Sequence, residues 1–150
     1  MKEEKQSSST PAAILSSINK NNVRFVDLQF TDLAGRLQHV TIPSRELSEH
    51  SFSVGVPKLD GSSIRGFVEI HESDLLLVPD PTTYAVLPWY SEEIKTARLL
   101  CDVYRGFGAG RLLWDPRAIA QKAEAELNKL GYTTSYWGPE VEFFVFDRVV

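Results

Sequence analysis

The sequence predicts an α+β fold, in which a small and largely antiparallel sheet is followed by the opening of a second domain. Short apolar segments bounded by turn residues fill most of the first two thirds of the chain, with little helix between them. Helix-start signals occur near the N-terminus and again after a glycine-rich connector at 105–114. We therefore expect a flexible tail and short helix over 1–20, a sheet domain over 21–106 and the start of a second, truncated domain over 112–150.

The composition is that of an ordinary globular chain. Of its 150 residues, 43% are hydrophobic and 24% are charged, which is enough for a packed core. The net charge of −4 offers no basic surface for nucleic acid, and no window approaches the roughly 20 apolar residues of a membrane helix. The single cysteine, Cys101, rules out a disulfide framework within the chain, and the polar N-terminus lacks a signal-peptide core. We expect a cytoplasmic protein that binds neither nucleic acid nor a membrane.

The first signals in chain order predict a helix and a hairpin. Thr10-Pro11 is an N-cap followed by proline at the first helical position, and it predicts a helix over 12–20. Apolar residues then alternate with polar ones over 23–30, and a second strand pattern runs over 36–42. Gly35 lies in the turn between them and supplies a positive φ. We expect the two segments to pair as a hairpin.

Weaker signals follow through the rest of the sheet domain. Ser44 caps a short helical turn, and proline or glycine interrupts most of the later segments. The segment 96–104 carries the clearest strand pattern of this region. The expected elements are a helical turn over 44–50, a loop or edge strand over 52–58, a loop over 60–64, and strands over 66–70, 84–87 and 96–104.

The second helix begins at Asp115-Pro116, which repeats the cap-and-proline signal. Its apolar residues recur at helical spacing as far as Leu130, and Gly131 stands at the C′ position. The chain then ends in a strongly apolar stretch, with no later strand to pair with it. This ending indicates the front part of something longer, or a fragment that needs other chains.

Glu140 and Glu142 are the candidate metal ligands. The residues around them over 141–146 are β-branched or aromatic and favour a strand. Side chains alternate along a strand, so both carboxylates point the same way, roughly 6.6 Å apart. Hard ions such as Mg²⁺ and Mn²⁺ take carboxylate oxygen, and each glutamate could serve a separate ion. The alternative is a solvated strand face with the aromatic residues buried beneath it.

Several stretches together resemble the glutamine synthetase family. The resemblance runs from Val23 to Asp147, and its motifs occur in the family's order and spacing. The matching stretches are Lys58 to Phe67, Glu72-Ser73-Asp74, Pro79-Asp80, Cys101 to Tyr104, Asp115-Pro116-Arg117 and Gly138 to Asp147. The resemblance implies a β-grasp N-terminal domain over 21–106, followed by the first helix and strand of a much larger catalytic domain. It also implies ATP-dependent ligation of ammonia to glutamate, giving glutamine through a γ-glutamyl phosphate.

The resemblance also implies the roles of individual residues. Glu140 would bind the divalent ion nearer the ATP phosphates and Glu142 the ion nearer glutamate and ammonium, with Mg²⁺ or Mn²⁺ as cofactor and ATP as co-substrate. Asp60 would reach the active site of the adjacent subunit in a homo-oligomeric ring, attract ammonium, and accept or relay its proton. Gly61 would allow the sharp turn that presents Asp60, and Ser63 would add a hydrogen bond. Without the resemblance, the stretch from Asp60 to Ser63 is an ordinary hydrophilic turn.

Two other functions remain open. A γ-glutamyl amine ligase joins glutamate to a larger amine, but such relatives tend to lose the Asp-Gly-Ser-Ser loop that this chain retains at 60–63. A non-catalytic β-grasp module would instead act through contacts with a synthetase subunit. The chain also carries only two of the metal ligands that the family's site needs, so we expect it to be inactive alone.

Overall fold

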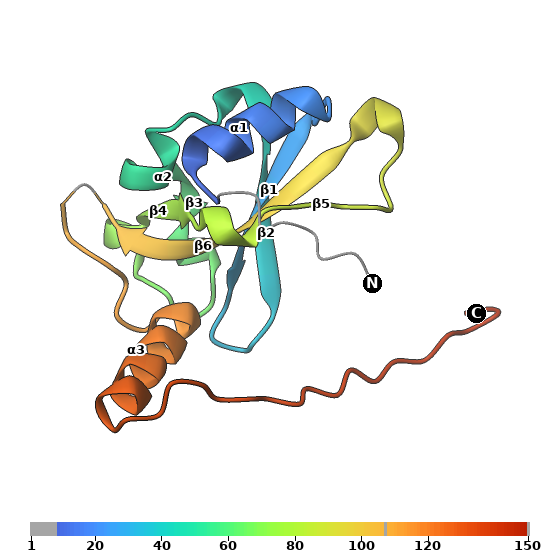
Figure 1. Ribbon diagram of the computed structural model, residues 1–150. Helices are drawn as coiled ribbons and strands as arrows, with labels where there is room; N and C mark the ends of the chain where they lie inside the picture. Colours follow the sequence, from blue (N-terminus) through green and yellow to red (C-terminus); the bar gives the residue numbers. More distant parts are fainter. Residues whose placement is uncertain (1–8, 107, 150) are drawn as a thin grey trace.

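The computed structural model describes residues 9–106 and 108–149, and it contains a six-stranded sheet flanked by helices (Figure 1). The helices are α1 (Pro11–Lys20), α2 (Ser51–Val54) and α3 (Pro116–Lys129), and the strands are β1 (Phe25–Thr31), β2 (Leu37–Pro43), β3 (Val56–Asp60), β4 (Asp74–Pro79), β5 (Ala85–Val86) and β6 (Thr96–Arg105). The 3₁₀ turns are η1 (Ser44–Glu46), η2 (Gly61–Ser63), η3 (Ile70–Glu72), η4 (Pro81–Thr83) and η5 (Glu92–Ile94). The tail expected before α1 lies, for residues 1–8, outside the described residues.

The sheet is organised around β6, which pairs with three neighbours. Its first half lies parallel to β1 and antiparallel to β5, whereas its second half lies antiparallel to β4. β2 and β3 form the two edges, and each is antiparallel to its neighbour, in the order β2-β1-β6-β4-β3. The expected α+β fold with a largely antiparallel sheet is therefore confirmed, and β1–β6 is the one parallel pair among the described strands.

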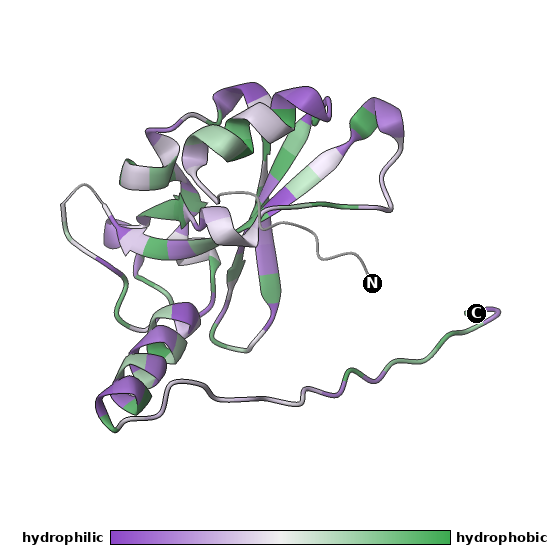
Figure 2. Ribbon diagram, in the orientation of Figure 1, coloured by the Kyte–Doolittle hydropathy of each residue, from purple (hydrophilic) through white to green (hydrophobic). Residues whose placement is uncertain are grey.

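The hydrophobic core joins the sheet to α1, and Figure 2 shows hydrophobic positions on both. Val26 on β1 and Leu99 and Val103 on β6 are fully buried. Ile14 and Ile18 lie one helical turn apart on α1 and pack into the same core. Full burial of an aliphatic side chain contributes about 1.5–3 kcal/mol, so these contacts hold together the sheet that carries the candidate site.

Both cap-and-proline signals mark true helix starts. Thr10 Oγ1 accepts a hydrogen bond from Ala13 N at 3.3 Å, and Asp115 Oδ1 accepts one from Arg117 N at 3.1 Å. Gly131 follows α3 with a φ of 89°, as expected for the residue that ends a helix. The two predicted helices, the hairpin of β1 and β2, and the strand at β6 are thus confirmed.

The strand expected at 66–70 is wrong. Gly66 lies in a turn with a φ of 84°, and the chain continues as irregular backbone into η3. Phe67 is buried, with its ring centroid 5.9 Å from that of Phe30. One apolar side chain therefore anchors this segment to the core, and its backbone has no neighbouring strand among the described residues. The segment 52–58, expected as a loop or edge strand, contains the end of α2 and the start of β3.

The strand expected around Glu140 and Glu142 is also wrong for the chain as described. Residues 132–149 run as an extended segment away from α3, and no described strand pairs with it (Figure 1). Val141 is 84% exposed and Phe144 is 87% exposed, so the aromatic residues are not buried beneath a strand face either. A strand needs backbone partners on a neighbouring strand, and the residues that the structure describes supply none here.

Among the described residues, no helix combines the length and the apolar character needed to cross a membrane.

Candidate functional site

Asp60 stands where β3 ends and the 3₁₀ turn η2 begins. Its backbone is paired with Asp74 on β4, so the sheet fixes its position. Its side chain turns back over η2 and caps it, as an aspartate at an N-cap position commonly does. The sheet and the cap together hold this exposed carboxylate in one place at the edge of the domain.

Three donors within the next three residues surround the Asp60 carboxylate. Ser62 donates to Oδ1 through its backbone N–H at 3.0 Å and through its hydroxyl at 2.6 Å. The Ser63 hydroxyl donates to Oδ2 at 2.8 Å. These hydrogen bonds lower the pKa of Asp60 below its ordinary value of 3.8, and the bond from the Ser62 side chain has the largest effect, followed by the bond from Ser63. Asp60 is therefore ionised at neutral pH.

The Asp60 carboxylate can accept one further hydrogen bond. An ionised carboxylate has about four lone-pair positions, and the serines occupy three of them. The group is solvent-exposed, so a cation that carries N–H groups can approach the remaining position. The arrangement can therefore attract a small cation and orient it by a hydrogen bond.

Gly61 is required for a reason other than the one the sequence suggests. Its φ lies outside the left-handed region, so the turn does not need glycine for its backbone conformation. A Cβ placed on Gly61 would lie 2.6 Å from Val68 Cγ2 and would overlap the Leu75 side chain. The close approach of the loop to Val68 and Leu75, rather than the sharpness of the turn, excludes a side chain at this position.

An open depression of about 720 Å³ adjoins Asp60. Lys58, Asp60 and Asp74 contribute its charged groups, and Leu75 and Gly106 also line it. A volume of this size is far larger than an ammonium ion, and the depression is open to solvent. Asp60 therefore lies on an open surface. Water would be excluded from Asp60 only if a second protein surface covered the depression.

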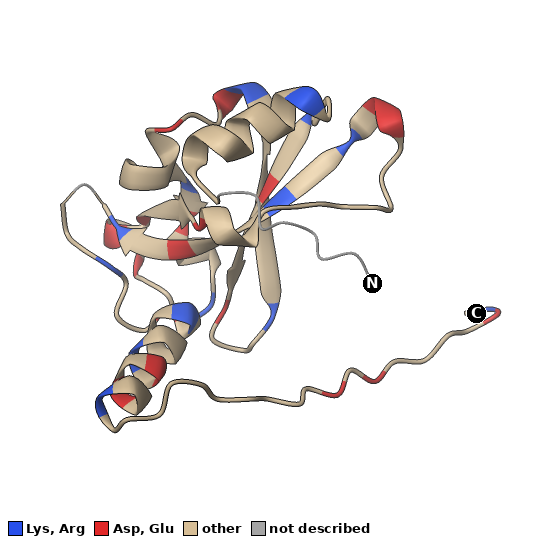
Figure 3. Cartoon of the chain, in the orientation of Figure 1, with Lys and Arg blue, Asp and Glu red and all other residues tan. Residues whose placement is uncertain are grey.

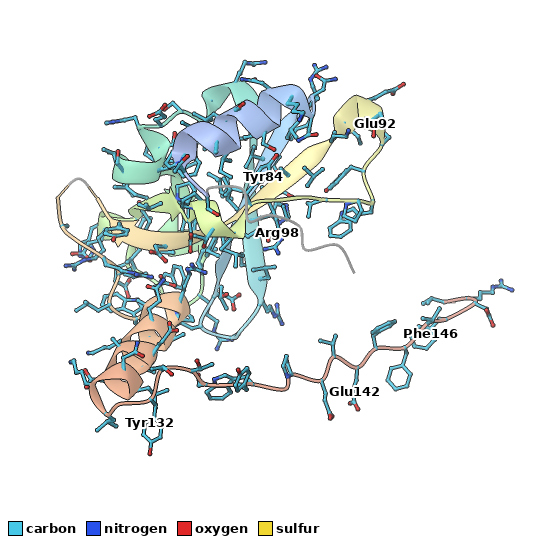
Figure 4. The ribbon with its side chains drawn as sticks, viewed as in Figure 1. Tyr84, Glu92, Arg98, Tyr132, Glu142 and Phe146 are labelled. Carbon is cyan, nitrogen blue, oxygen red and sulfur yellow. The ribbon has the colours of Figure 1, made fainter. Side chains whose placement is uncertain are left out.

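Glu140 and Glu142 are both exposed on the extended segment, as Figure 4 shows for Glu142. Their positions, two residues apart on extended backbone, suit two oxygen ligands on one side of the chain. Among the residues that the structure describes, no cluster of three or more His, Cys, Asp or Glu could hold a metal ion. The structure thus brings Asp60 and Ser63 together, but it does not gather further ligands around the two glutamates.

Ser62 is a further hydrogen-bond partner of Asp60, whereas the sequence led us to expect only Ser63 in this position. The signal was present in the sequence, since an Asp side chain in a turn often accepts from the backbone N–H two residues further along, which here belongs to Ser62. The chain repeats this arrangement at Asp80, whose Oδ1 accepts from Thr82 N at 2.9 Å and from Thr82 Oγ1 at 2.6 Å.

Cys101 is not a candidate nucleophile. Its thiol lies on β6 and is almost completely buried. Burial raises the pKa of Cys101 far above its ordinary range. The reactive thiolate is therefore absent at neutral pH.

Comparison with known proteins gives matches to one family along most of the chain. The family model described as the glutamine synthetase β-grasp domain matches residues 22–106, and the model described as the glutamine synthetase catalytic domain matches residues 113–150. A glutamine synthetase of Sulfolobus acidocaldarius is 54% identical over 135 residues, which are 90% of this chain and 28% of that protein. A glutamine synthetase of Aquifex aeolicus is 48% identical over 141 residues, which are 93% of this chain and 29% of that protein.

A solved structure shows the same fold. The glutamine synthetase of Plasmodium falciparum matches with a TM-score of 0.71 and 22% sequence identity, over 87% of this chain and 24% of that one. This chain spans less than a third of the length of the curated relatives that it matches. The β-grasp match covers more than half of the chain, and the relatives match it nearly throughout. The chain therefore belongs to the glutamine synthetase family, with a β-grasp domain and part of the catalytic domain.

Proposed function

We propose that this chain forms the N-terminal part of an enzyme that ligates ammonia to glutamate with ATP, giving glutamine. In this proposal the β-grasp domain occupies 21–106, and the catalytic domain begins at 112. The observation that carries the proposal is the exposed, ionised Asp60 carboxylate, held by Ser62 and Ser63, in a chain that matches both glutamine synthetase domains.

The reaction requires activation of a carboxylate. The γ-carboxylate of glutamate is a poor electrophile, so its oxygen first takes the γ-phosphoryl group of ATP, which releases ADP and forms γ-glutamyl phosphate. Ammonia then attacks the acyl carbon, the C–N bond forms, and inorganic phosphate leaves. Divalent ions, when bound, neutralise and orient the phosphate charges in such a transfer.

We assign Asp60 to the ammonium ion. Its lowered pKa makes it a persistent anion, which attracts a cation more strongly than a neutral hydrogen-bonding group would. Its remaining lone-pair position can accept one ammonium N–H. The ammonium ion must lose a proton before it attacks, and Asp60 can accept or relay that proton as the C–N bond forms. Because a low pKa makes a weak base, attraction of ammonium is the larger of its two contributions.

We assign Glu140 and Glu142 to the divalent ions. Both side chains are exposed and offer carboxylate oxygens, which Mg²⁺ and Mn²⁺ accept as ligands. Glu140 would hold the ion nearer the ATP phosphates, and Glu142 would hold the ion nearer glutamate and ammonium. The strongly exposed aromatic residues beside them, including Phe143 and Phe144, support packing of this segment against the remainder of a catalytic domain.

We further propose a homo-oligomeric ring in which Asp60 completes the active site of the adjacent subunit. The open depression beside Asp60 supports this arrangement, because only a second surface could close it. The acidic composition and the single buried cysteine support a cytoplasmic location and argue against nucleic acid as a partner.

A chimera tests the proposed reaction. This chain would replace the matching part of the Sulfolobus acidocaldarius glutamine synthetase, and light scattering would establish whether the chimera assembles. We expect ammonium- and glutamate-dependent phosphate release by the assembled chimera, and none by the 150-residue chain alone. An assembled chimera that uses putrescine but not ammonium would instead support a γ-glutamyl amine ligase. Assembly without either activity would support a non-catalytic subunit-contact module.

A further inference from the structure

Charged and amide side chains gather where α3 leaves the β-grasp sheet. We call them the arginine cluster, and Figure 3 shows basic and acidic positions close together around the N-terminal end of α3. They come from the end of β4, from β6, from the connector and from α3. The members of the cluster are Asp80, Asp102, Arg111, Asp115, Arg117 and Gln121.

Arg117 is the member that spans the junction. It lies in the first turn of α3, its Nε donates to Asp102 Oδ1 on β6 at 2.9 Å, and its Nη2 forms an ion pair with Asp80 at the end of β4. The planar guanidinium thus contacts two carboxylates, Asp102 on β6 and Asp80, which follows β4 and caps η4. Its side chain is 23% exposed, so the pairs are partly shielded from water.

Arg111 and Asp115 reinforce this attachment from the connector. Arg111 Nη2 donates to Asp102 Oδ1 at 2.8 Å and to Asp115 Oδ2 at 3.2 Å. Asp115 is fully buried and also accepts from Val103 N at 3.2 Å. Gln121 Nε2 reaches Asp102 Oδ1 at 3.3 Å from the second turn of α3. These contacts are confined to the beginning of the helix.

Apolar packing adds little to the attachment of α3. Among the described residues of α3, none is fully buried, although Pro116, Arg117 and Ala118 are half-buried. Ile119 is 52% exposed, and Leu130, just after the helix, is 73% exposed. The orientation of α3 on the sheet therefore depends mainly on the charged contacts of its first two turns.

We propose that Arg117 is a positioning residue that fixes the angle between α3 and the β-grasp sheet. The sheet carries Asp60, and α3 leads into the segment that carries Glu140 and Glu142, so this angle determines where Asp60 is placed relative to the rest of the chain. The catalytic consequence rests on the proposed function, whereas the attachment of α3 is a property of this chain. Loss of the Arg117 bridge frees the helix without disturbing the core.

Hydrogen exchange measured by mass spectrometry tests the attachment in the 150-residue chain. In Arg117→Gln, amides of α3 should exchange about fivefold faster or more, while those of β1 and β6 keep their protection. Lys129→Gln is the matched control, because Lys129 pairs with Glu126 within the same helix at 2.7 Å. Unchanged exchange in Arg117→Gln, equal acceleration in Lys129→Gln, or an α3 without protection in the unsubstituted chain would each overturn the proposal.

Asp80→Asn is the second variant, and it decides the question if Arg117→Gln unfolds the whole domain. It removes the charge that pairs with Arg117, yet its side-chain oxygen can still accept from Thr82. We expect the same local acceleration in α3 alone. Uniform acceleration throughout the chain, or none, would overturn the proposal.

The chimera described above supplies a functional readout. With Arg117→Gln, the KM for ammonium should rise about threefold or more while the KM for ATP stays unchanged, since this residue acts on the placement of Asp60. An equal rise in both KM values, or none, would overturn the catalytic part of the proposal. If the unsubstituted chimera assembles but lacks activity, the proposed function fails, and hydrogen exchange still decides the role of Arg117.

Discussion

The Trp114 indole Nε1–H donates to the Phe67 carbonyl oxygen at 2.6 Å, across 47 positions of sequence. This bond ties the connector before α3 to the segment that follows the Asp60 loop. The Phe67 ring is buried beside Phe30, so the carbonyl is held by the core as well. The loop that carries Asp60 is therefore bounded by β3 at one end and by this anchor at the other.

Trp114→Phe should weaken this anchor. The substitution removes the donor to the Phe67 carbonyl while it keeps an aromatic ring, and we expect the free energy of unfolding to fall by about 1 kcal/mol. Urea denaturation would measure the change. Trp89→Phe is the control, because Trp89 is 71% exposed, and its substitution should have no measurable effect. Equal losses in the two variants would contradict the assigned role of the Trp114 bond.

Gly61→Ala should destabilise the domain by about 1–3 kcal/mol, because the added methyl group overlaps Val68 and Leu75. Gly138→Ala provides the comparison, since a Cβ on Gly138 meets no atom within 4 Å. Thermal unfolding of both variants would check the difference. A Gly61→Ala chain as stable as Gly138→Ala would show that steric exclusion does not explain the glycine.

Ser62→Ala should raise the pKa of Asp60 toward 3.8, because Ser62 is the main cause of its lowering. Ser63→Ala should raise it by less. The Asp60 carboxylate stabilises the folded state above pH 3.8, the ordinary pKa of the group. This stabilisation is lost as the pH falls through the lower pKa that Asp60 has in the folded state. Carboxyl carbon NMR during an acid titration would measure the shift. Ser53→Ala, whose hydroxyl bonds the His50 carbonyl instead, should leave the Asp60 pKa unchanged.

Asp115→Ala should cost about 2–4 kcal/mol of unfolding free energy, because it removes a helix cap and leaves the buried Val103 N–H without an acceptor. Thr10→Ala removes the cap of α1, which is exposed, and should cost about 0.5–1 kcal/mol. Urea denaturation would compare the two. Equal costs would show that burial of Asp115 adds nothing to its cap.

Short sequence patterns predicted the helices and strands that are determined by residues close together in the chain. The caps at Thr10 and Asp115 and the alternation in β1 identified both long helices and the hairpin. The prediction failed where a distant partner decides the structure. Val68 and its neighbours have strand-like side chains, yet among the described residues neither they nor the segment around Glu140 has an adjacent strand.

The candidate site was predictable to a similar degree. Asp60 and Ser63 were identified by resemblance, and their hydrogen bond is present. The second donor, Ser62, could have been inferred from local turn chemistry. The bridge from Arg117 to Asp80 and Asp102 could not, because it joins residues up to 37 positions apart whose contact depends on the fold of the sheet.

The ammonium dependence of the assembled chimera with Asp60→Asn tests the account most directly. Asparagine keeps the size of the side chain and removes its charge, so electrostatic attraction of the cation is lost. We predict that the KM for ammonium rises about tenfold or more, while the KM values for ATP and glutamate stay within about twofold. An unchanged KM for ammonium in an active Asp60→Asn chimera would contradict the central claim that this carboxylate recruits the ammonium ion.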